Sequence, residues 1–167
     1  IFSAGEDGRF MTFDIAKDKV IPLDTKKPIT AAAVAVDRMS FFLANEYSAA
    51  ITQYDIFGKP LRTFEGHSND ITDLAVTIDR KFLISASKDK TIKIWTIANG
   101  KELKTLSGHT WEVKDIDIDI SGKFLVSCGL DGKVILWDVA SGEILMTQDL
   151  PGAKCNALAL SPNLTQI

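Results

Sequence analysis

Cysteine and histidine are scarce in this sequence. Of the 167 residues, 2 are Cys and 2 are His. Cys128 and Cys155 are too few for a disulfide framework and lack a metal-ligand spacing. Each lies in a strand-like run, where we expect a buried thiol that acts as a small hydrophobe. The sequence therefore predicts no metal site and a reducing, intracellular compartment, either cytoplasmic or nuclear and nucleolar.

Long apolar runs and a large charge of one sign are also missing. No apolar run approaches the roughly 20 residues that a membrane span needs, and residues 1–4 have no signal-peptide pattern. The net charge is −3, and acidic and basic residues are interspersed. We interpret the lysines within residues 88–104 as a solvated polar face rather than a basic patch. We expect no membrane contact, and direct nucleic-acid contact stays open although the charge does not indicate it.

An internal repeat is the strongest signal that the sequence contains. Four pairs of residues are each separated by 42 positions: His67 and His109, Ser85 and Ser127, Asp89 and Asp131, and Trp95 and Trp137. Two weaker copies precede them, because Phe13-Asp14 and Tyr54-Asp55 are 41 residues apart and Trp95 follows Tyr54 by another 41. The shared period predicts about four copies of one structural unit.

Within each copy the local pattern is that of β-structure. Residues 71–76 and 113–118 alternate between apolar and polar or run apolar and β-branched. Short breakers of the kind found in tight hairpins stand at positions 79–80, 99–100, 121–122 and 141–142. Four short strands in about 42 residues are typical of a propeller blade, a sheet that buries its faces against its neighbours.

These features resemble the WD40 family: Gly-His before an inner strand, Asp in the turn between the second and third strands, and Trp-Asp at the end of the third. The resemblance is strongest over residues 66–138. It implies an all-β WD40 β-propeller in which about four blades of four antiparallel strands belong to a larger, seven-bladed ring. The blades implied are 1–25 (in part), 26–65, 66–107, 108–150 and the start of another at 151–167. A longer chain, or a second copy, would supply the remaining blades.

The resemblance also implies a buried hydrogen-bond relay in each complete blade. The members would be His67, Ser85, Asp89 and Trp95 in one blade, and His109, Ser127, Asp131 and Trp137 in the next. A buried indole N–H needs an acceptor, which a hydroxyl, an imidazole and a carboxylate can supply in series. The first two blades lack the complete relay, so we expect them to be less rigid.

A catalytic interpretation of these Ser, His and Asp residues is disfavoured. Both histidines occupy one structural position in successive repeats, whereas a catalytic group should interrupt the repeat. The sequence also contains no Gly-rich phosphate loop and no nucleophile elbow. We therefore predict that the chain is not an enzyme and binds no cofactor.

Variable positions beside the relay form the candidate binding surface. The residues just before the relay Asp, or just after the relay His, are Glu6, Tyr47, Asn69, Lys88, Trp111 and Leu130. They differ between copies whose surrounding frame is constant, which suits recognition by a fixed scaffold. Trp111 is either an interface anchor or a packing residue against a neighbouring blade.

The predicted function is that of a non-catalytic scaffold or adaptor, which binds protein partners through the propeller rim. Residues 155–163 resemble late blades of ribosome-associated WD40 scaffolds, and residues 66–138 resemble WD40 subunits of ribosome-biogenesis assemblies. The resemblance therefore suggests a subunit of a multiprotein or ribonucleoprotein assembly. The alternative is a regulatory or sensor propeller of a larger enzyme whose catalytic domain lies outside this chain.

Overall fold

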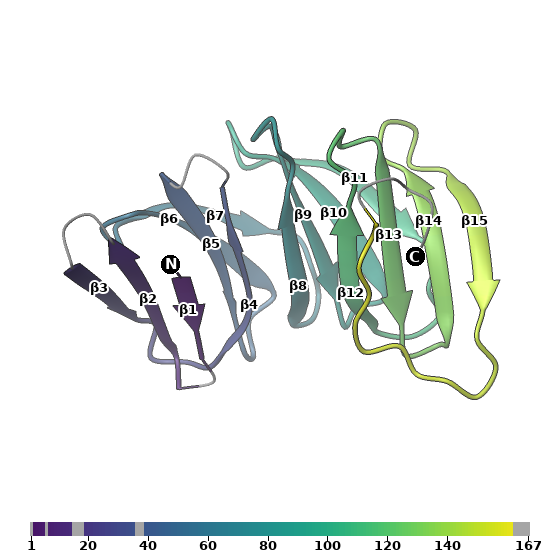
Figure 1. Ribbon diagram of the computed structural model, residues 1–167, viewed down its shortest axis with the longest axis horizontal. Helices are drawn as coiled ribbons and strands as arrows, with labels where there is room; N and C mark the ends of the chain where they lie inside the picture. Colours follow the sequence, from purple (N-terminus) through teal and green to yellow (C-terminus); the bar gives the residue numbers. More distant parts are fainter. Residues whose placement is uncertain (1, 6, 15–18, 36–38, 162–167) are drawn as a thin grey trace.

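The computed structural model of the chain describes residues 2–5, 7–14, 19–35 and 39–161. These residues form fifteen strands in four antiparallel sheets (Figure 1). Sheet I consists of β1 (Phe2–Ala4), β2 (Arg9–Asp14) and β3 (Lys19–Asp24). Sheet II consists of β4 (Ile29–Val34), β5 (Ser40–Asn45), β6 (Ala50–Asp55) and β7 (Pro60–Glu65).

The next two sheets have the same strand order. Sheet III consists of β8 (Ile71–Val76), β9 (Phe82–Ser87), β10 (Thr91–Thr96) and β11 (Glu102–Ser107). Sheet IV consists of β12 (Val113–Ile118), β13 (Phe124–Gly129), β14 (Lys133–Asp138) and β15 (Ile144–Asp149). In each four-stranded sheet, every strand pairs with the strand next to it in the chain.

The sheets stand side by side like the blades of a propeller. The first strands of sheets II, III and IV are neighbours, since β8 contacts both β4 and β12. Figure 1 shows β1–β3 at one end of the row and β15 at the other, without closure into a ring in the part of the chain described. The predicted all-β propeller blades are confirmed, although sheet I has three strands. The predicted blade boundaries and the total blade number stay predictions.

A β-bulge shapes the first strand of each four-stranded sheet. The register of β12 on β13 shifts between Val113 and Asp115, and β8 and β4 shift at the same place in their pairings. The extra residue of a bulge turns the following side chains to the other face. Val113 and Ile116 are therefore both buried although three positions separate them, while Asp115 and Asp117 are half-buried.

Apolar cores fill the space between consecutive sheets. Between sheets II and III, Phe42, Phe64 and Trp95 are each at most 1% exposed and pack in one cluster. Between sheets III and IV, Ile92 and Leu106 pack in the cluster that contains Val113 and Trp137. Burial of one such side chain is worth about 1.5–3 kcal/mol. Most of the stability of each sheet therefore comes from its neighbours.

The cysteines do not behave as the sequence analysis predicted. Cys128 on β13 and Cys155, which follows β15, form a disulfide across 27 residues of sequence. The prediction of two separate buried thiols is wrong, because the two positions meet only when the chain after sheet IV lies against that sheet. The expectation of an intracellular compartment loses the support of free thiols and stays a prediction. Among the described residues, no helix has the length and hydropathy needed to cross a bilayer.

The hairpin between β8 and β9 contains a residue in an unfavourable backbone conformation. Arg80, in the turn between β8 and β9, has a φ of 61°, and Gly122 holds the equivalent place between β12 and β13 with a φ of 72°. A side chain in the left-handed region costs about 1–2 kcal/mol, partly offset by the greater freedom of glycine in the unfolded chain. We expect Arg80→Gly to raise the free energy of unfolding by about 0.5–1 kcal/mol, measured by urea denaturation. Gly122→Arg should lower it, and a loss of stability in Arg80→Gly would contradict the argument.

Candidate functional site

Two hydrogen-bond relays cross sheets III and IV. In sheet III, Trp95 Nε1 donates to Ser85 Oγ at 2.8 Å, and Ser85 Oγ lies 2.8 Å from His67 Nε2. His67 Nδ1 lies 2.7 Å from Asp89 Oδ2. The chain of bonds runs from the apolar core between the sheets to the loop that precedes β8, and therefore ties both to one sheet.

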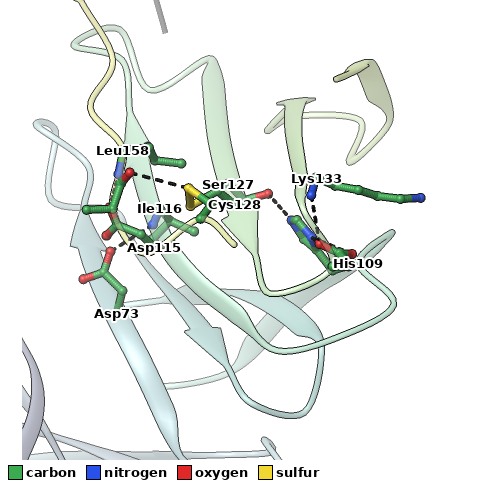
Figure 2. The surroundings of a disulfide bond; sticks show 11 residues. Asp73, His109, Asp115, Ile116, Ser127, Cys128, Lys133 and Leu158 are labelled. Atoms are coloured by element: carbon green, nitrogen blue, oxygen red, sulfur yellow. Dashed lines mark hydrogen bonds and ion pairs between the residues drawn. A yellow bond between two sulfur atoms is a disulfide. The ribbon is translucent and has the colours of Figure 1, made fainter. Parts of the chain in front are cut away.

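The relay of sheet IV has the same geometry. Trp137 Nε1 donates to Ser127 Oγ at 2.8 Å, and Ser127 Oγ lies 2.8 Å from His109 Nε2. His109 Nδ1 lies 3.0 Å and 3.1 Å from the two carboxylate oxygens of Asp131. Figure 2 shows His109 beside Ser127 at the end of this sheet. The structure thus brings together the predicted members of both relays.

The relay carboxylates also fix the loops outside them. Asp89 Oδ2 accepts the backbone N–H of Ser68, and Asp131 Oδ2 accepts that of Thr110, at 3.0 Å and 2.8 Å. Each accepted N–H belongs to the residue after the relay histidine. Loop positions next to the relay are thereby held in place relative to the sheets, as a binding surface requires.

Burial and hydrogen bonding together set the charge of these groups. Burial lowers the pKa of His109 below its ordinary value, against the opposing influence of Asp131, so the imidazole is neutral at pH 7. Burial raises the pKa of Asp89, but hydrogen bonds from His67, Thr91 and Ser68 outweigh it and hold the pKa well below its usual range. A neutral imidazole with its proton on Nδ1 can donate to the carboxylate and accept from the serine.

We term the end of the sheets that carries Asp89 and Asp131 the relay-side rim. Large side chains are exposed there. Tyr47, in the turn between β5 and β6, is 81% exposed, and Trp111, just before β12, is 55% exposed. Trp111 is therefore not a buried residue packed against a neighbouring blade. Asn69 is exposed, and Leu130 is half-buried. Glu6, the remaining predicted position, lies outside the described residues.

Lys88 occupies a polar part of the relay-side rim. Its Nζ lies 2.9 Å from Asp70 Oδ2. The hydrogen bond to Asp70, and weaker attraction from Glu112 and Glu46, raise the pKa of Lys88 above its ordinary value, so it stays charged. A charge already matched by a carboxylate gives a partner less free energy than an unmatched one.

A groove of about 510 Å³ lies beside Lys88 and joins three sheets. Its polar lining residues are Thr30, Glu46, Thr72, Lys88 and Lys114. Thr72 donates its hydroxyl proton to the Val113 carbonyl at 2.7 Å, which links β8 to β12 across the groove. Glu46 and Lys114 were not predicted from the sequence, although Glu46 directly precedes Tyr47. The groove offers hydroxyl groups and charges of both signs.

Comparison with known families agrees with this geometry. The family model described as WD domain, G-beta repeat matches residues 58–96 and 100–138. These two segments are WD40 repeats. In a comparison with curated proteins, none matched the chain. The two matched repeats end at Trp95-Thr96 and at Trp137-Asp138, and they include all eight relay residues.

The WD40 blades carry one further polar contact that the sequence analysis did not single out. On β8, Asp73 accepts the backbone N–H groups of Leu74 at 2.8 Å and of Ile116, on β12, at 3.0 Å. The pKa of Asp73 is raised to about 7, chiefly by burial and secondly by a hydrogen bond to Asp115. The aspartates at equivalent places in two repeats were a signal in the sequence, but their contact depends on how two blades pack. No cluster of three or more metal-binding side chains occurs among the residues described.

Loss of a relay member should destabilise the fold. His109→Ala would leave the buried Ser127 hydroxyl proton without its acceptor and would remove the imidazole donor to the Asp131 carboxylate. We expect the free energy of unfolding to fall by about 1–3 kcal/mol, the usual cost of an unpaired buried polar group. Urea denaturation measures this, with Lys101→Ala, an exposed turn position, as the control. A loss in His109→Ala no larger than in the control would refute a structural relay.

The Asp73–Asp115 contact predicts a pH dependence. Because the pKa of Asp73 is higher in the folded than in the unfolded chain, its contribution to stability is present below pH 3.8 and decreases as the pH rises through about 7. In Asp115→Asn the new amide can donate to Asp73 and still accept the N–H of Leu158. We expect this variant to gain stability relative to wild type as the pH rises through that window. Equal pH profiles in urea denaturation would contradict it.

Proposed function

We propose that this WD40 chain is a non-catalytic scaffold that binds a protein partner through the relay-side rim. WD40 repeats generally mediate protein–protein interaction and scaffolding, and WD40 propellers are typically non-catalytic. The observation that supports the rim as the binding surface is the exposure of Tyr47 (81%) and Trp111 (55%) beside loops that the relays hold. Aromatic side chains in that setting are typical anchors of a protein interface, since they bury a large area at low entropic cost.

The groove supports the same surface. It lies at the rim and presents Glu46 and Lys114 beside the threonine hydroxyls. A partner segment can match both charges while its apolar side chains cover the two aromatics. Interfaces of this kind combine an apolar centre with polar groups around it. We propose that the partner belongs to a multiprotein or ribonucleoprotein assembly in which the chain is a subunit.

An affinity capture with matched variants tests the proposal. Tyr47→Ala combined with Trp111→Ala should weaken binding at least about thirtyfold and so retain much less partner from a cell extract than wild type, because truncating one aromatic anchor commonly costs about 2 kcal/mol or more. Phe57→Ala is the control, because Phe57 is 73% exposed in the turn at the opposite end of β6. Mass spectrometry would quantify the captured proteins, after thermal unfolding has verified that each variant folds.

The outcomes separate the parts of the proposal. Partners lost in the double variant and retained in Phe57→Ala would support the relay-side rim. Equal capture by wild type and the double variant would refute that surface. A parallel sample treated with ribonuclease tests the assembly type, since partners held through RNA would be lost and directly bound proteins would stay.

A further inference from the structure

The Cys128–Cys155 disulfide holds a segment that has no strand of its own in the structure. Residues 153–160, which we term the clamped segment, follow β15 and run back along sheet IV (Figure 2). Cys128 lies on β13 in the middle of that sheet. The bond therefore fastens the chain that leaves sheet IV to the face of the same sheet.

The disulfide occupies a position that apolar packing fills elsewhere. Ala44 and Ile71 are 27 residues apart and belong to the core between sheets II and III. Ala86 and Val113 have the same separation and belong to the core between sheets III and IV. All four are 0% exposed. At the third junction the equivalent pair is Cys128 and Cys155, so a covalent bond takes the place of a buried apolar contact.

Other contacts on the clamped segment are polar and partly exposed. Leu158 donates its backbone N–H to Asp115 at 2.6 Å, and Leu160 donates to Asp117 at 2.7 Å. The first of these repeats the bond from Ile116 to Asp73. However, Leu158 is half-buried, whereas Ile116 is only 5% exposed. The disulfide and these two hydrogen bonds hold the segment against sheet IV.

We propose that Cys128–Cys155 is a reversible thiol–disulfide site, which fixes the clamped segment on sheet IV when oxidised and releases it when reduced. This proposal does not depend on the scaffold function. Cys128 is 0% exposed and Cys155 is half-buried, so of the two residues only Cys155 is accessible to a reductant. The reductant is a dithiol, either a small molecule or a dithiol protein.

The exchange balances in two steps. A thiolate of the dithiol attacks Cys155 Sγ, the S–S bond breaks, and the electron pair goes to Cys128 Sγ, which takes up a proton. The second thiolate then attacks the mixed disulfide, and Cys155 leaves as a thiolate that is protonated in turn. The protein gains two electrons and two protons and contains two thiols, while the dithiol is oxidised to its disulfide.

Release of the clamped segment would also change the structure of the relay-side rim. A shallow pocket of about 370 Å³ is lined by Leu130, Asp131 and Gly132 on one side and by residues 149–154 on the other. Leu150 donates its backbone N–H to the Gly132 carbonyl at 2.7 Å. The clamped segment begins within that loop, so its release would loosen the wall of this pocket beside the Asp131 relay.

Hydrogen exchange of the whole chain tests the proposal in its oxidised form, after reduction with dithiothreitol, and after reoxidation. We expect the amides of Leu158 and Leu160 to exchange about tenfold faster after reduction, since they would open locally, and to recover on reoxidation. The amides of Ile92 and Ile94 in sheet III should not change. A thiol assay on each sample establishes its redox state.

A variant drawn from the repeat provides the matched control. Cys128→Ala with Cys155→Val reproduces the Ala86 and Val113 pair, so its exchange should not respond to dithiothreitol. Four results would overturn the proposal: a disulfide that does not form under mild oxidation, a disulfide that dithiothreitol does not reduce in the folded chain, unchanged exchange at Leu158 after verified reduction, or an equal response in the variant.

Discussion

Sheets II and III each have two faces with apolar side chains, and each buries them by packing against the sheet before it and the sheet after it. Trp95 and Trp137 each project into the core shared with the preceding sheet and are 1% exposed. This inter-sheet contact explains why one pattern recurs along the chain, because every junction needs the same apolar positions. At the junction after sheet IV, the pair that is apolar at the other two junctions is the Cys128–Cys155 disulfide.

The relays connect this packing to the binding surface. Each begins at a core tryptophan and ends at a carboxylate that accepts a hydrogen bond from a loop backbone. The position of the rim loops is therefore fixed relative to the core. Sheets III and IV contain complete relays. In sheet II, by contrast, aromatic contacts between Phe42 and Phe64 and onward to Trp95 occupy the core. A rigid frame with different side chains at equivalent positions can present a distinct surface without a change of fold.

Much of this could be predicted from the sequence, because the repeat places equivalent residues in register. The strands and the turns follow from one period of 42, which appears in the spacing of His67 and His109, and the WD40 resemblance implied the relay of eight residues. The candidate rim positions also followed from spacing, but their exposure did not. Trp111 could have been packed or exposed, and only the path of the loop before β12 decides this.

The sequence by itself determined the all-β blades, their repeat and the relays, since these depend on residues within one repeat and on the alternation of side chains along a strand. The tertiary structure alone decided which residues meet between repeats: Cys128 with Cys155, Asp73 with Asp115, and the groove beside Lys88. The physical reason is that these contacts depend on the position of one sheet relative to the next. That position is set by the summed packing of many apolar side chains and not by any local pattern.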